Sequence, residues 1–364
     1  MAKDRLFQQE QRLQRVITEK RIMARLQHPF VVSLHSAFQT STHLFLVLDF
    51  CGGGELFFHM LQRRYFEEPD AMFYFCEILL GLEYLHSQQV LYRDLKPENC
   101  LLDMEGHVRL TDFGLSKDEG LTPTARFTSF VGTAGYLSPE MVQRQGHSTP
   151  LDFYCLGCLL YCLQTGSLPH YEGDYKVMIQ KRIKGEQCAF PHWISTDSKK
   201  LMKGLLSPEP STRLGSQRGA IEVKEHRWLF EVDWAKVYRR ESQKCFPNFP
   251  PIVPRRDITA NFSSEFTDGR GSRCPATSAA SRTRRRPAAS FTRPWTASRR
   301  SWAENEVLRH AWSRHWPCLD PRHASVAHEF EGLAATQRTA RTPKGRWDGQ
   351  CGMVLCTAAG RLTF

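Results

Sequence analysis

The sequence predicts an α+β fold followed by a disordered tail, on three observations. Two short runs rich in leucine, aromatic and β-branched residues, 31–36 and 44–50, are typical of strands. Beyond them apolar residues recur at helical spacing, as in residues 69–86, which predicts a mainly helical second part. After about residue 269 the composition changes and no regular period is sustained. We therefore expect ordered structure before that point and disorder after it.

The remaining elements follow from local patterns along the chain. Residues 5–26 place apolar side chains at helical spacing opposite a charged face, which predicts an amphipathic helix. The three glycines at 52–54 mark a break before a helix. Pro69 suits the start of the next helix, because the first N–H groups of a helix have no internal partner. Later helices are predicted at residues 151–164, 176–183 and 198–206.

Charge is spread unevenly along the 364 residues. Residues 1–269 carry 32 basic and 32 acidic side chains, whereas residues 270–364 carry 17 and 6, so the tail holds the net charge of +11. A basic tail without a recognised fold is more often solvated than bound to nucleic acid, so nucleic acid is not the expected partner. If it were, salt-sensitive binding would disappear on deletion of the tail. The sudden excess of arginine over lysine raises the hypothesis that an altered reading frame or a retained non-coding segment encodes the tail.

Hydropathy and cysteine usage narrow the class of protein. No apolar run reaches the ~18 residues of a membrane span, and residues 1–20 are charged rather than signal-like. We therefore expect a cytoplasmic or nuclear protein without a membrane span. Eight of the 12 cysteines lie within residues 1–269, several of them in apolar runs, so we expect free thiols. Cys155 and Cys158 have redox spacing, but their apolar surroundings favour structural burial over redox or metal chemistry.

Three motifs carry the chemistry of the second part. They are Tyr92-Arg93-Asp94-Leu95-Lys96-Pro97-Glu98-Asn99, Asp112-Phe113-Gly114 and Ser138-Pro139-Glu140. In this order and at these separations they match the catalytic loop, the metal-binding triplet and the end of the activation segment of protein kinases. Each triplet alone is common by chance, but an unrelated domain would not match all three.

Residues 1 to about 269 resemble an AGC-type serine/threonine protein kinase, and most of all the ribosomal S-six kinases and their related proteins. The resemblance implies a bilobal protein-kinase fold with an incomplete N-terminal β lobe and a mainly helical C-terminal lobe. It divides the chain into an N-lobe remnant (1–47), the hinge and C-lobe (48–230), an AGC-type C-terminal extension (231–269) and an Arg-rich, disordered tail (270–364). Besides the three motifs, the residues that carry it are His28-Pro-Phe30, Leu48-Asp-Phe50, Tyr92 in place of the usual histidine, the continuation to Lys117, and Ser211-Thr-Arg-Leu-Gly215.

The resemblance implies transfer of the ATP γ-phosphoryl group to Ser or Thr hydroxyls of protein substrates. Such a reaction needs a positioned hydroxyl and neutralised phosphate charge. The implied roles are catalytic base for Asp94 and phosphate contact for Lys96. Asn99 and Asp112 are the implied ligands of Mg2+, which prefers oxygen donors.

The implied nucleotide site spans both lobes. Glu19 matches the helix glutamate that pairs with a phosphate-gripping lysine; the alternative is a solvated glutamate on an amphipathic helix. Leu101 matches the residue beneath the adenine ring, and Glu55 is assigned to the same site. The hinge that binds adenine through its backbone is Leu48, Asp49, Phe50 and Cys51.

Substrate choice and regulation are implied by three further residues. Glu55 and Glu98 match acidic positions that read arginine upstream of the phosphorylated residue. Gly135 stands where relatives commonly carry another acid, which leaves this preference open. Ser129 occupies the activation-loop phosphosite, where a phosphate would attract Arg93 and Lys117 and would require an upstream activating kinase. The alternative for Ser129 is an ordinary loop serine, and we expect a monomer.

Structural roles are implied for residues of the lower lobe and of the lobe boundary. Asp152 is expected to anchor the catalytic loop, and Glu140 is expected to form an ion pair with Arg213. A hydrophobic stack that joins the lobes is implied for Met23, Leu34, Tyr92 and Phe113.

The family's Gly-rich loop and strand lysine are not recognised in the sequence. The lysine lies about 20 residues before the glutamate matched by Glu19, which places it ahead of Met1. We therefore expect an impaired kinase whose remaining strands leave an unpaired sheet edge. The alternative is a catalytically silent, pseudokinase-like fragment that acts as a protein-interaction module.

Overall fold

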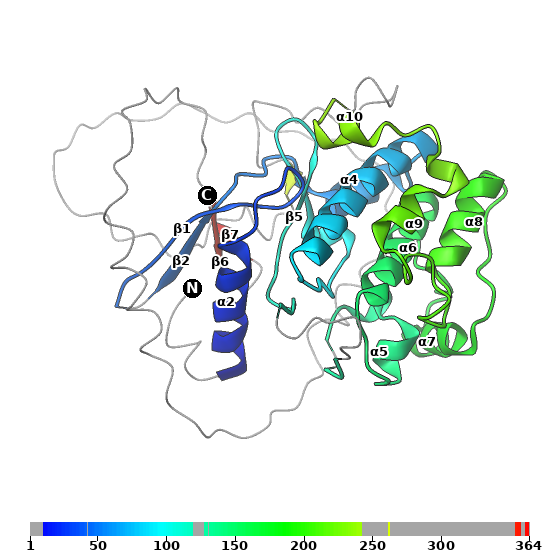
Figure 1. Cartoon of the computed structure of the whole chain (residues 1–364), viewed down its shortest axis with the longest axis horizontal. Helices are drawn as coiled ribbons and strands as arrows, with labels where there is room; N and C mark the ends of the chain where they lie inside the picture. Colours follow the sequence, from blue (N-terminus) through cyan, green and yellow to red (C-terminus); the bar gives the residue numbers. More distant parts are fainter. Residues whose placement is uncertain are drawn as a thin grey trace, which may run out of the picture. The chain divides into compact units, whose positions relative to one another are not determined.

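The computed structural model describes residues 10–41, 43–118, 127–129, 131–241, 261–262, 354–357 and 361–363. All of them belong to one compact unit formed by Met1–Gly269 and Gly332–Phe364. A small sheet with one helix lies beside a larger group of helices (Figure 1). The predicted α+β class is therefore confirmed.

The small sheet contains both strands predicted for the first part of the chain, but the first strand begins later than predicted. β1 (Leu34–Gln39) pairs antiparallel with β2 (Leu44–Leu48), and helix α2 (Glu10–Met23) contacts β1. Residues 31–36 were expected to form the first strand, but β1 begins at Leu34. Val31 and Val32 are buried and join Leu110 instead, Val31 through a β-bridge and Val32 by donating its N–H to the Leu110 carbonyl at 3.0 Å.

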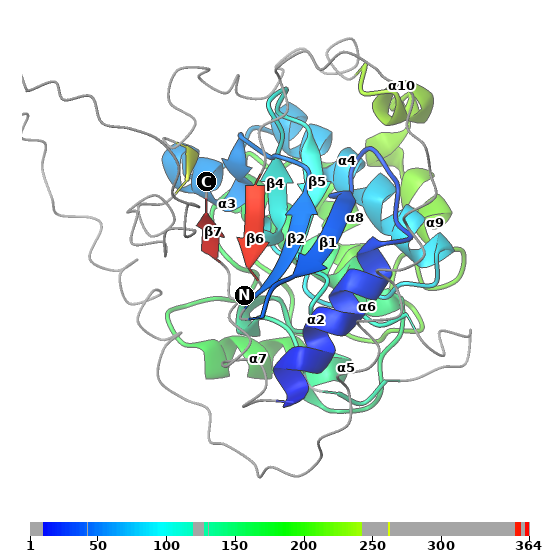
Figure 2. The ribbon, with the colours of Figure 1, turned by 90° about the vertical axis from the view of Figure 1, so that its left-hand side faces the viewer.

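The other edge of β2 is paired with the C-terminal part of the chain. β6 (Val354–Thr357) runs antiparallel to β2 and is followed by β7 (Arg361–Thr363), which gives the order β1-β2-β6-β7 (Figure 2). Two expectations are corrected here: the edge of β2 is not unpaired, and the tail contains two strands. An open strand edge presents unpaired N–H and C=O groups, and the apolar, β-prone residues of β6 suit it. The rest of the tail, including residues 270–331, lies outside the described residues.

A second, three-stranded sheet lies between the small sheet and the helices. β3 (Gly54–Glu55), β4 (Cys100–Leu102) and β5 (Val108–Leu110) are antiparallel neighbours in that order. These strands are too short to show a period in the sequence, and the prediction lacks them. They nevertheless frame the catalytic motifs, because the catalytic loop enters β4 and the Asp112 triplet follows β5.

The helical lobe is built around α6 (Pro150–Thr165), which is buried along almost its whole length. It packs against α4 (Glu68–Ser87) and α8 (Thr196–Leu205). Burial of Cys155 and Cys158 within α6 raises the pKa of both thiols, which confirms the structural interpretation of that pair. The helices predicted at 69–86, 151–164, 176–183 and 198–206 agree with the structure to within two residues. The helix predicted at 5–26 is α2, which ends at Met23, three residues earlier than expected, and residues 5–9 lie outside the described residues. The other α-helices of the described residues are α3 (Leu56–Arg63), α5 (Pro139–Val142), α7 (Tyr175–Lys184), α9 (Ala220–Lys224) and α10 (Trp234–Tyr238). Short 3-10 helices span Pro97–Asn99, Ala134–Tyr136 and Arg227–Leu229.

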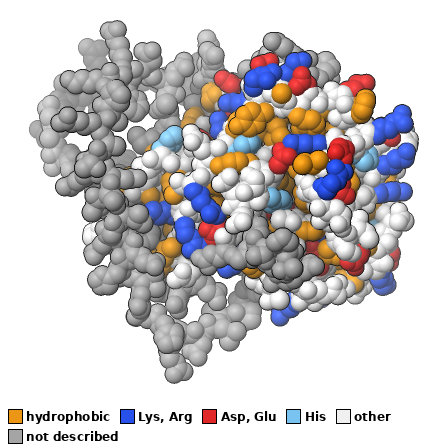
Figure 3. Space-filling view, in the orientation of Figure 1, with side chains coloured by type: hydrophobic (Ala, Val, Ile, Leu, Met, Phe, Trp, Pro, Cys, Tyr) orange, Lys and Arg blue, Asp and Glu red, His pale blue; other side chains and the backbone are white. Residues whose placement is uncertain are grey.

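The surface and hydropathy of the described segments agree with the composition. On the face shown in Figure 3, acidic and basic side chains are interspersed over the helical lobe, as expected from the balanced charge of residues 1–269. Among the described helices, none is both long and apolar enough to cross a lipid bilayer.

Candidate active site

Asp152 holds the catalytic loop in place, as predicted. Its carboxylate is completely buried at the start of α6 and accepts the N–H groups of Tyr92 at 3.0 Å and Arg93 at 2.8 Å. His86 Nε2 lies 2.8 Å from the same carboxylate. Arg93 adopts a φ of 70°, a left-handed conformation unusual for a side-chain-bearing residue. The two N–H bonds therefore fix the backbone directly before Asp94.

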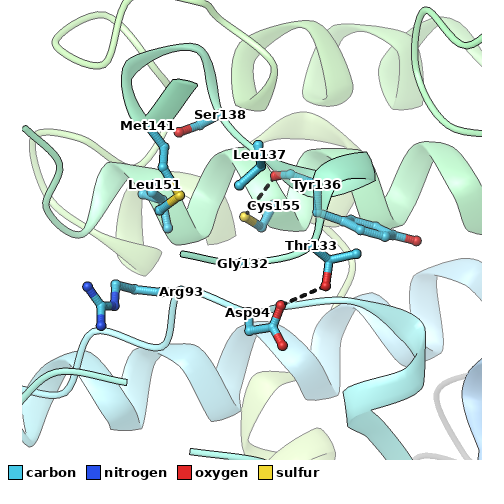
Figure 4. A pocket seen from close by; sticks show the side chains of 10 residues that line it. All are labelled: Arg93, Asp94, Gly132, Thr133, Tyr136, Leu137, Ser138, Met141, Leu151 and Cys155. Carbon is cyan, nitrogen blue, oxygen red and sulfur yellow. Dashed lines mark hydrogen bonds between the residues drawn. The ribbon is translucent and has the colours of Figure 1, made fainter. Parts of the chain in front are cut away.

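Asp94 is the centre of a compact hydrogen-bonded network. Its Oδ2 accepts from Lys96 Nζ at 2.8 Å and from Asn99 Nδ2 at 2.9 Å. Its Oδ1 accepts from Thr133 Oγ1 at 3.0 Å, the contact drawn in Figure 4. Lys96 Nζ also donates to Thr133 Oγ1 at 2.9 Å. The structure thus brings three predicted residues together and adds Thr133, which sequence reasoning missed although it lies beside the recognised activation-segment motif.

Asp112 and Asn99 offer oxygen atoms to a cation. Both N–H groups of the Asn99 amide are directed at Asp94, to its carbonyl at 2.8 Å and its carboxylate, so the Asn99 Oδ1 atom is left as an acceptor. Desolvation of the Asp112 carboxyl and the nearby charge of Asp94 raise the Asp112 pKa, although much of the residue is exposed. Crowded carboxylates of this kind are relieved by a bound cation, so the donor chemistry fits magnesium. The described residues contain no cluster of three or more His, Cys, Asp or Glu side chains suited to a metal.

A hydrophobic contact supports the metal-binding triplet from within. Phe113 is completely buried, and its ring centroid lies 5.5 Å from that of Tyr92. Tyr92 in turn donates its hydroxyl to the carbonyl of Thr111. Met23 of α2 is also buried, and Leu34 packs against the same core. The implied stack therefore consists of buried or half-buried core residues on both sides of the lobe boundary.

Glu19 is buried rather than solvated. Only 8% of the residue is exposed, which excludes the alternative of a solvated surface glutamate. Burial, and secondarily the charge of Asp112, raise the Glu19 pKa to about 8. Among the residues that the structure describes, Glu19 forms no ion pair. Helix α2 is held nearby by Arg21 and Arg25, whose guanidinium groups lie 2.7 and 3.4 Å from Asp118.

The predicted hinge residues follow directly from strand β2 and are buried or half-buried. Leu48 ends β2 and is 6% exposed, and Cys51 is also buried, with half-buried Asp49 and Phe50 between them. Leu101 of β4 and Glu55 of β3 are cross-strand partners, so two predicted site residues lie side by side.

Asn261 and Phe262 of the predicted C-terminal extension lie beside the glycines that follow the hinge. Asn261 Nδ2 donates to the carbonyl of Gly52 at 3.2 Å, and Phe262 is 6% exposed. Gly54 has a φ of 74°, and a Cβ atom there would lie 2.0 Å from the Asn261 carbonyl oxygen. Sequence reasoning did not single out Asn261, although the residues around it identified the predicted extension.

The predicted substrate-reading acids differ in their surroundings. Glu98 is half-buried, its Oε2 atom has no hydrogen-bond partner in the described part of the chain, and burial raises its pKa. Glu55 is half-buried as well. A side chain at Gly135 would place its Cβ 2.6 Å from a Leu168 methyl carbon, so this backbone position cannot accept the family's acid without a shift.

Ser129 contacts the basic residue Arg93. Arg93 Nη1 donates to the exposed Ser129 Oγ at 2.7 Å, while Arg93 Nε donates to the carbonyl of Leu115 at 2.7 Å. Burial lowers the Arg93 pKa to about 10; Asp152 opposes this effect and the charge of Arg15 adds to it. Arg15 of α2 is a basic residue that sequence reasoning missed, and its charge acts on Arg93. Lys117 is exposed.

Glu140 and Arg213 form the predicted ion pair. Both are almost completely buried, and Arg213 makes bidentate bonds of 2.7 and 2.9 Å to the Glu140 carboxylate. The guanidinium also lies 4.9 Å from the centroid of the Tyr154 ring. This pair fixes the end of the activation segment against the helical lobe.

Comparisons with known proteins agree with this geometry. The model of the protein kinase domain family matches residues 1–229. The chain is 46% identical to human ribosomal protein S6 kinase alpha-1 over 250 residues, which are 68% of this chain and 33% of that protein. It is 45% identical to protein kinase 2 of Dictyostelium discoideum over 242 residues, which are 66% of this chain and 49% of that protein. It is 40% identical to the serine/threonine-protein kinase AtPK2/AtPK19 of Arabidopsis thaliana over 275 residues, which are 75% of this chain and 57% of that protein.

The aligned region covers only part of each of these relatives. The chain spans about a third of the length of the S6 kinase alpha-1 proteins that it matches. The match covers the catalytic loop, the Asp112 triplet and the activation segment described above. The chain therefore belongs to the protein kinase family, in which it is similar to the AGC-type ribosomal S6 kinases.

Proposed function

We propose that this chain transfers the γ-phosphoryl group of ATP to serine or threonine hydroxyls of protein substrates. The observation that carries the proposal is the network in which Asp94 accepts hydrogen bonds from Lys96, Asn99 and Thr133. Such a network holds a carboxylate and an ammonium group a few ångströms apart in a fixed orientation. Positioning and charge stabilisation of this kind supply most of the catalysis in phosphoryl transfer.

Each residue of the network has a distinct task in this proposal. The Asp94 carboxylate orients the substrate hydroxyl and accepts its proton, and Lys96 stabilises charge on the transferred phosphate. Asp112 and Asn99 would hold Mg2+, which neutralises phosphate charge when bound. Since they provide few ligands, phosphate oxygens and water would complete the shell, as is usual for magnesium.

The same site supports a preference for arginine before the phosphorylated residue. Glu98 Oε2 is a buried acceptor without a partner among the described residues, which a substrate guanidinium could satisfy. Phosphorylation of Ser129 by an upstream kinase is proposed as the activating event, since Arg93 already contacts its hydroxyl at 2.7 Å.

The test is magnesium-ATP phosphotransfer to an arginine-containing serine peptide. The Asp94→Asn variant preserves the shape of the side chain and should lose about 10²–10⁴-fold in rate, the usual contribution of a positioned general base. Asp197→Asn, at a half-buried position in the first turn of α8, is the matched control and should retain the rate. Equal rates for the wild type and Asp94→Asn would contradict the proposal.

A second candidate function is a catalytically silent interaction module. The observation that favours it is buried Glu19, which has no ion pair within the described segments. Folded, soluble protein without phosphotransfer above the Asp94→Asn background would place this candidate first.

A further inference from the structure

The side chain of the hinge residue Asp49 is tied to strand β1. Its Oδ2 accepts the N–H of Ser33 at 2.9 Å, and the N–H of Asp49 donates to the Ser33 carbonyl at 3.2 Å. His35 Nε2 lies 2.7 Å from Asp49 Oδ1. Reciprocal bonds therefore join the hinge to the residue that precedes β1, and the carboxylate is engaged on that side.

Arg109 extends this contact toward the second sheet. It lies on β5, and its Nη1 atom is 3.6 Å from Asp49 Oδ2, while its Nε atom is 3.6 Å from Asp103 Oδ2. At these distances the pairs are electrostatic contacts rather than direct hydrogen bonds. One cation is thus shared by a carboxylate of the hinge and a carboxylate of the β4–β5 connection.

Asp103 connects Arg109 to a second arginine at the end of α10. Its carboxylate also pairs with Arg240, which lies just after α10 and is 3.2 Å from Glu105. Asp49, Arg109, Asp103 and Arg240 are here called the hinge strut. It connects the hinge, the second sheet and the first part of the predicted C-terminal extension, three parts that are distant in sequence.

The hinge strut differs from an ordinary surface ion pair in its burial. The side chains of Asp49, Arg109 and Asp103 are 22%, 17% and 12% exposed, whereas those of the surface pair Arg218 and Glu225 are both 56% exposed. Partly buried charges are screened less by water and salt than exposed ones. Burial alone would raise the Asp49 pKa, but the Ser33 N–H, His35 and Arg109 together lower it.

We propose that the hinge strut positions the hinge for nucleotide binding, with Arg109 as a positioning residue that also couples the hinge to Arg240 and the C-terminal extension. A hinge held in one conformation loses less freedom when a ligand binds, which strengthens binding. The consequence for nucleotide rests on the proposed kinase function, whereas the effect on the hinge itself does not.

The first test measures the hinge without any ligand. Native-state hydrogen exchange, followed by NMR on the full chain, reads the amides of Ser33 and Asp49. In Arg109→Gln we expect both to exchange about tenfold faster, because a partly buried ion pair that steadies the Asp49 carboxylate is lost. Arg109→Lys should restore most of the protection, and Arg218→Gln, the same substitution in the surface pair, should leave both amides unchanged.

Two outcomes of that measurement overturn the proposal. One is unchanged exchange in Arg109→Gln; the other is acceleration in Arg218→Gln as large as in Arg109→Gln. If Arg109→Gln fails to fold, Asp49→Asn replaces it, because the amide can keep an acceptor for the Ser33 N–H while the charge that faces Arg109 and His35 is removed. The same acceleration is expected.

The second test measures binding of a fluorescent ADP analogue with magnesium. Arg109→Gln should weaken its affinity about three- to tenfold, and Arg109→Lys should recover it. Wild-type chain that binds no analogue would contradict the proposed kinase function, while the exchange measurement would still decide on the strut. Unchanged affinity in Arg109→Gln, where the wild type does bind, would overturn the positioning role.

Discussion

Arg93 donates a hydrogen bond from Nη1 to Ser129 Oγ over 2.7 Å, and the same Arg93 directly precedes Asp94. One side chain and one peptide unit therefore separate Ser129 from the Asp94 carboxylate, so we expect a change at Ser129 to affect Asp94. The Arg93 N–H donates to Asp152 Oδ1 at 2.8 Å. This bond fixes the backbone of Arg93 while its guanidinium group contacts the activation segment.

Phosphorylation of Ser129 should raise the phosphotransfer rate. A phosphate carries nearly two negative charges and would attract Arg93, Arg15 and Lys117, ordering the segment against α2. Chain phosphorylated at Ser129 should exceed Ser129→Ala by about tenfold or more in rate. Thr128→Ala, at the exposed neighbouring position, is the control and should respond to phosphorylation like the wild type. Equal rates for phosphorylated chain and Ser129→Ala would contradict this role.

Glu19 should make stability depend on pH. Its pKa is raised from 4.5 to about 8, so the folded state binds a proton more tightly than the unfolded state does. Stability is therefore highest at or below about pH 4.5 as far as this group is concerned, and it falls as the pH rises toward 8. Glu19→Gln removes the charge and should increase the free energy of unfolding at pH 8.5 by about 2 kcal/mol, with little effect at pH 5.

Urea denaturation of both proteins at the two pH values measures this difference. Glu186→Gln, an exposed glutamate just after α7, is the control and should show no such pH dependence. A stability gain in Glu19→Gln that is the same at pH 5 and pH 8.5 would show that burial of charge is not its cause.

Gly54→Ala should release the C-terminal extension from the hinge. The new Cβ would lie 2.0 Å from the Asn261 carbonyl oxygen, so Asn261 and Phe262 must move. Gly173→Ala is a matched control, since Gly173 also has a positive φ, 96°, but no atom within 4 Å of the added Cβ. Both variants share a backbone cost of about 1 kcal/mol, whereas only Gly54→Ala should speed proteolysis after residue 241. Identical digestion patterns would argue against the contact.

Arg213→Gln should destabilise the chain strongly. It leaves the Glu140 carboxylate buried without its cation, a change that costs about 3–5 kcal/mol. The double variant Glu140→Gln/Arg213→Gln should recover a large part of that loss, because no buried charge remains. Thermal and urea unfolding measure both, and equal losses in the single and double variants would show that the ion pair is not the origin of the effect.

Local patterns in the sequence determined much of this protein. The spacing of apolar residues located α4, α6, α7 and α8, because a helix repeats its environment every few residues along the chain. The order of the catalytic-loop, Asp112 and Ser138 motifs identified the family and the residues that meet at Asp94, since phosphoryl transfer demands those side chains at those separations. Two predicted anchors, Asp152 to the catalytic loop and Glu140 to Arg213, are confirmed.

Only the tertiary structure decided which side chains are buried and what they face. Glu19 lies on an amphipathic helix whose pattern alone left a solvated position open, and packing of α2 places it near Asp112. Asn261 meets Gly52 across 209 residues, and β6 pairs with β2 across a still longer separation. Contacts of this kind depend on how finished elements pack against one another, and no local period or motif encodes that arrangement.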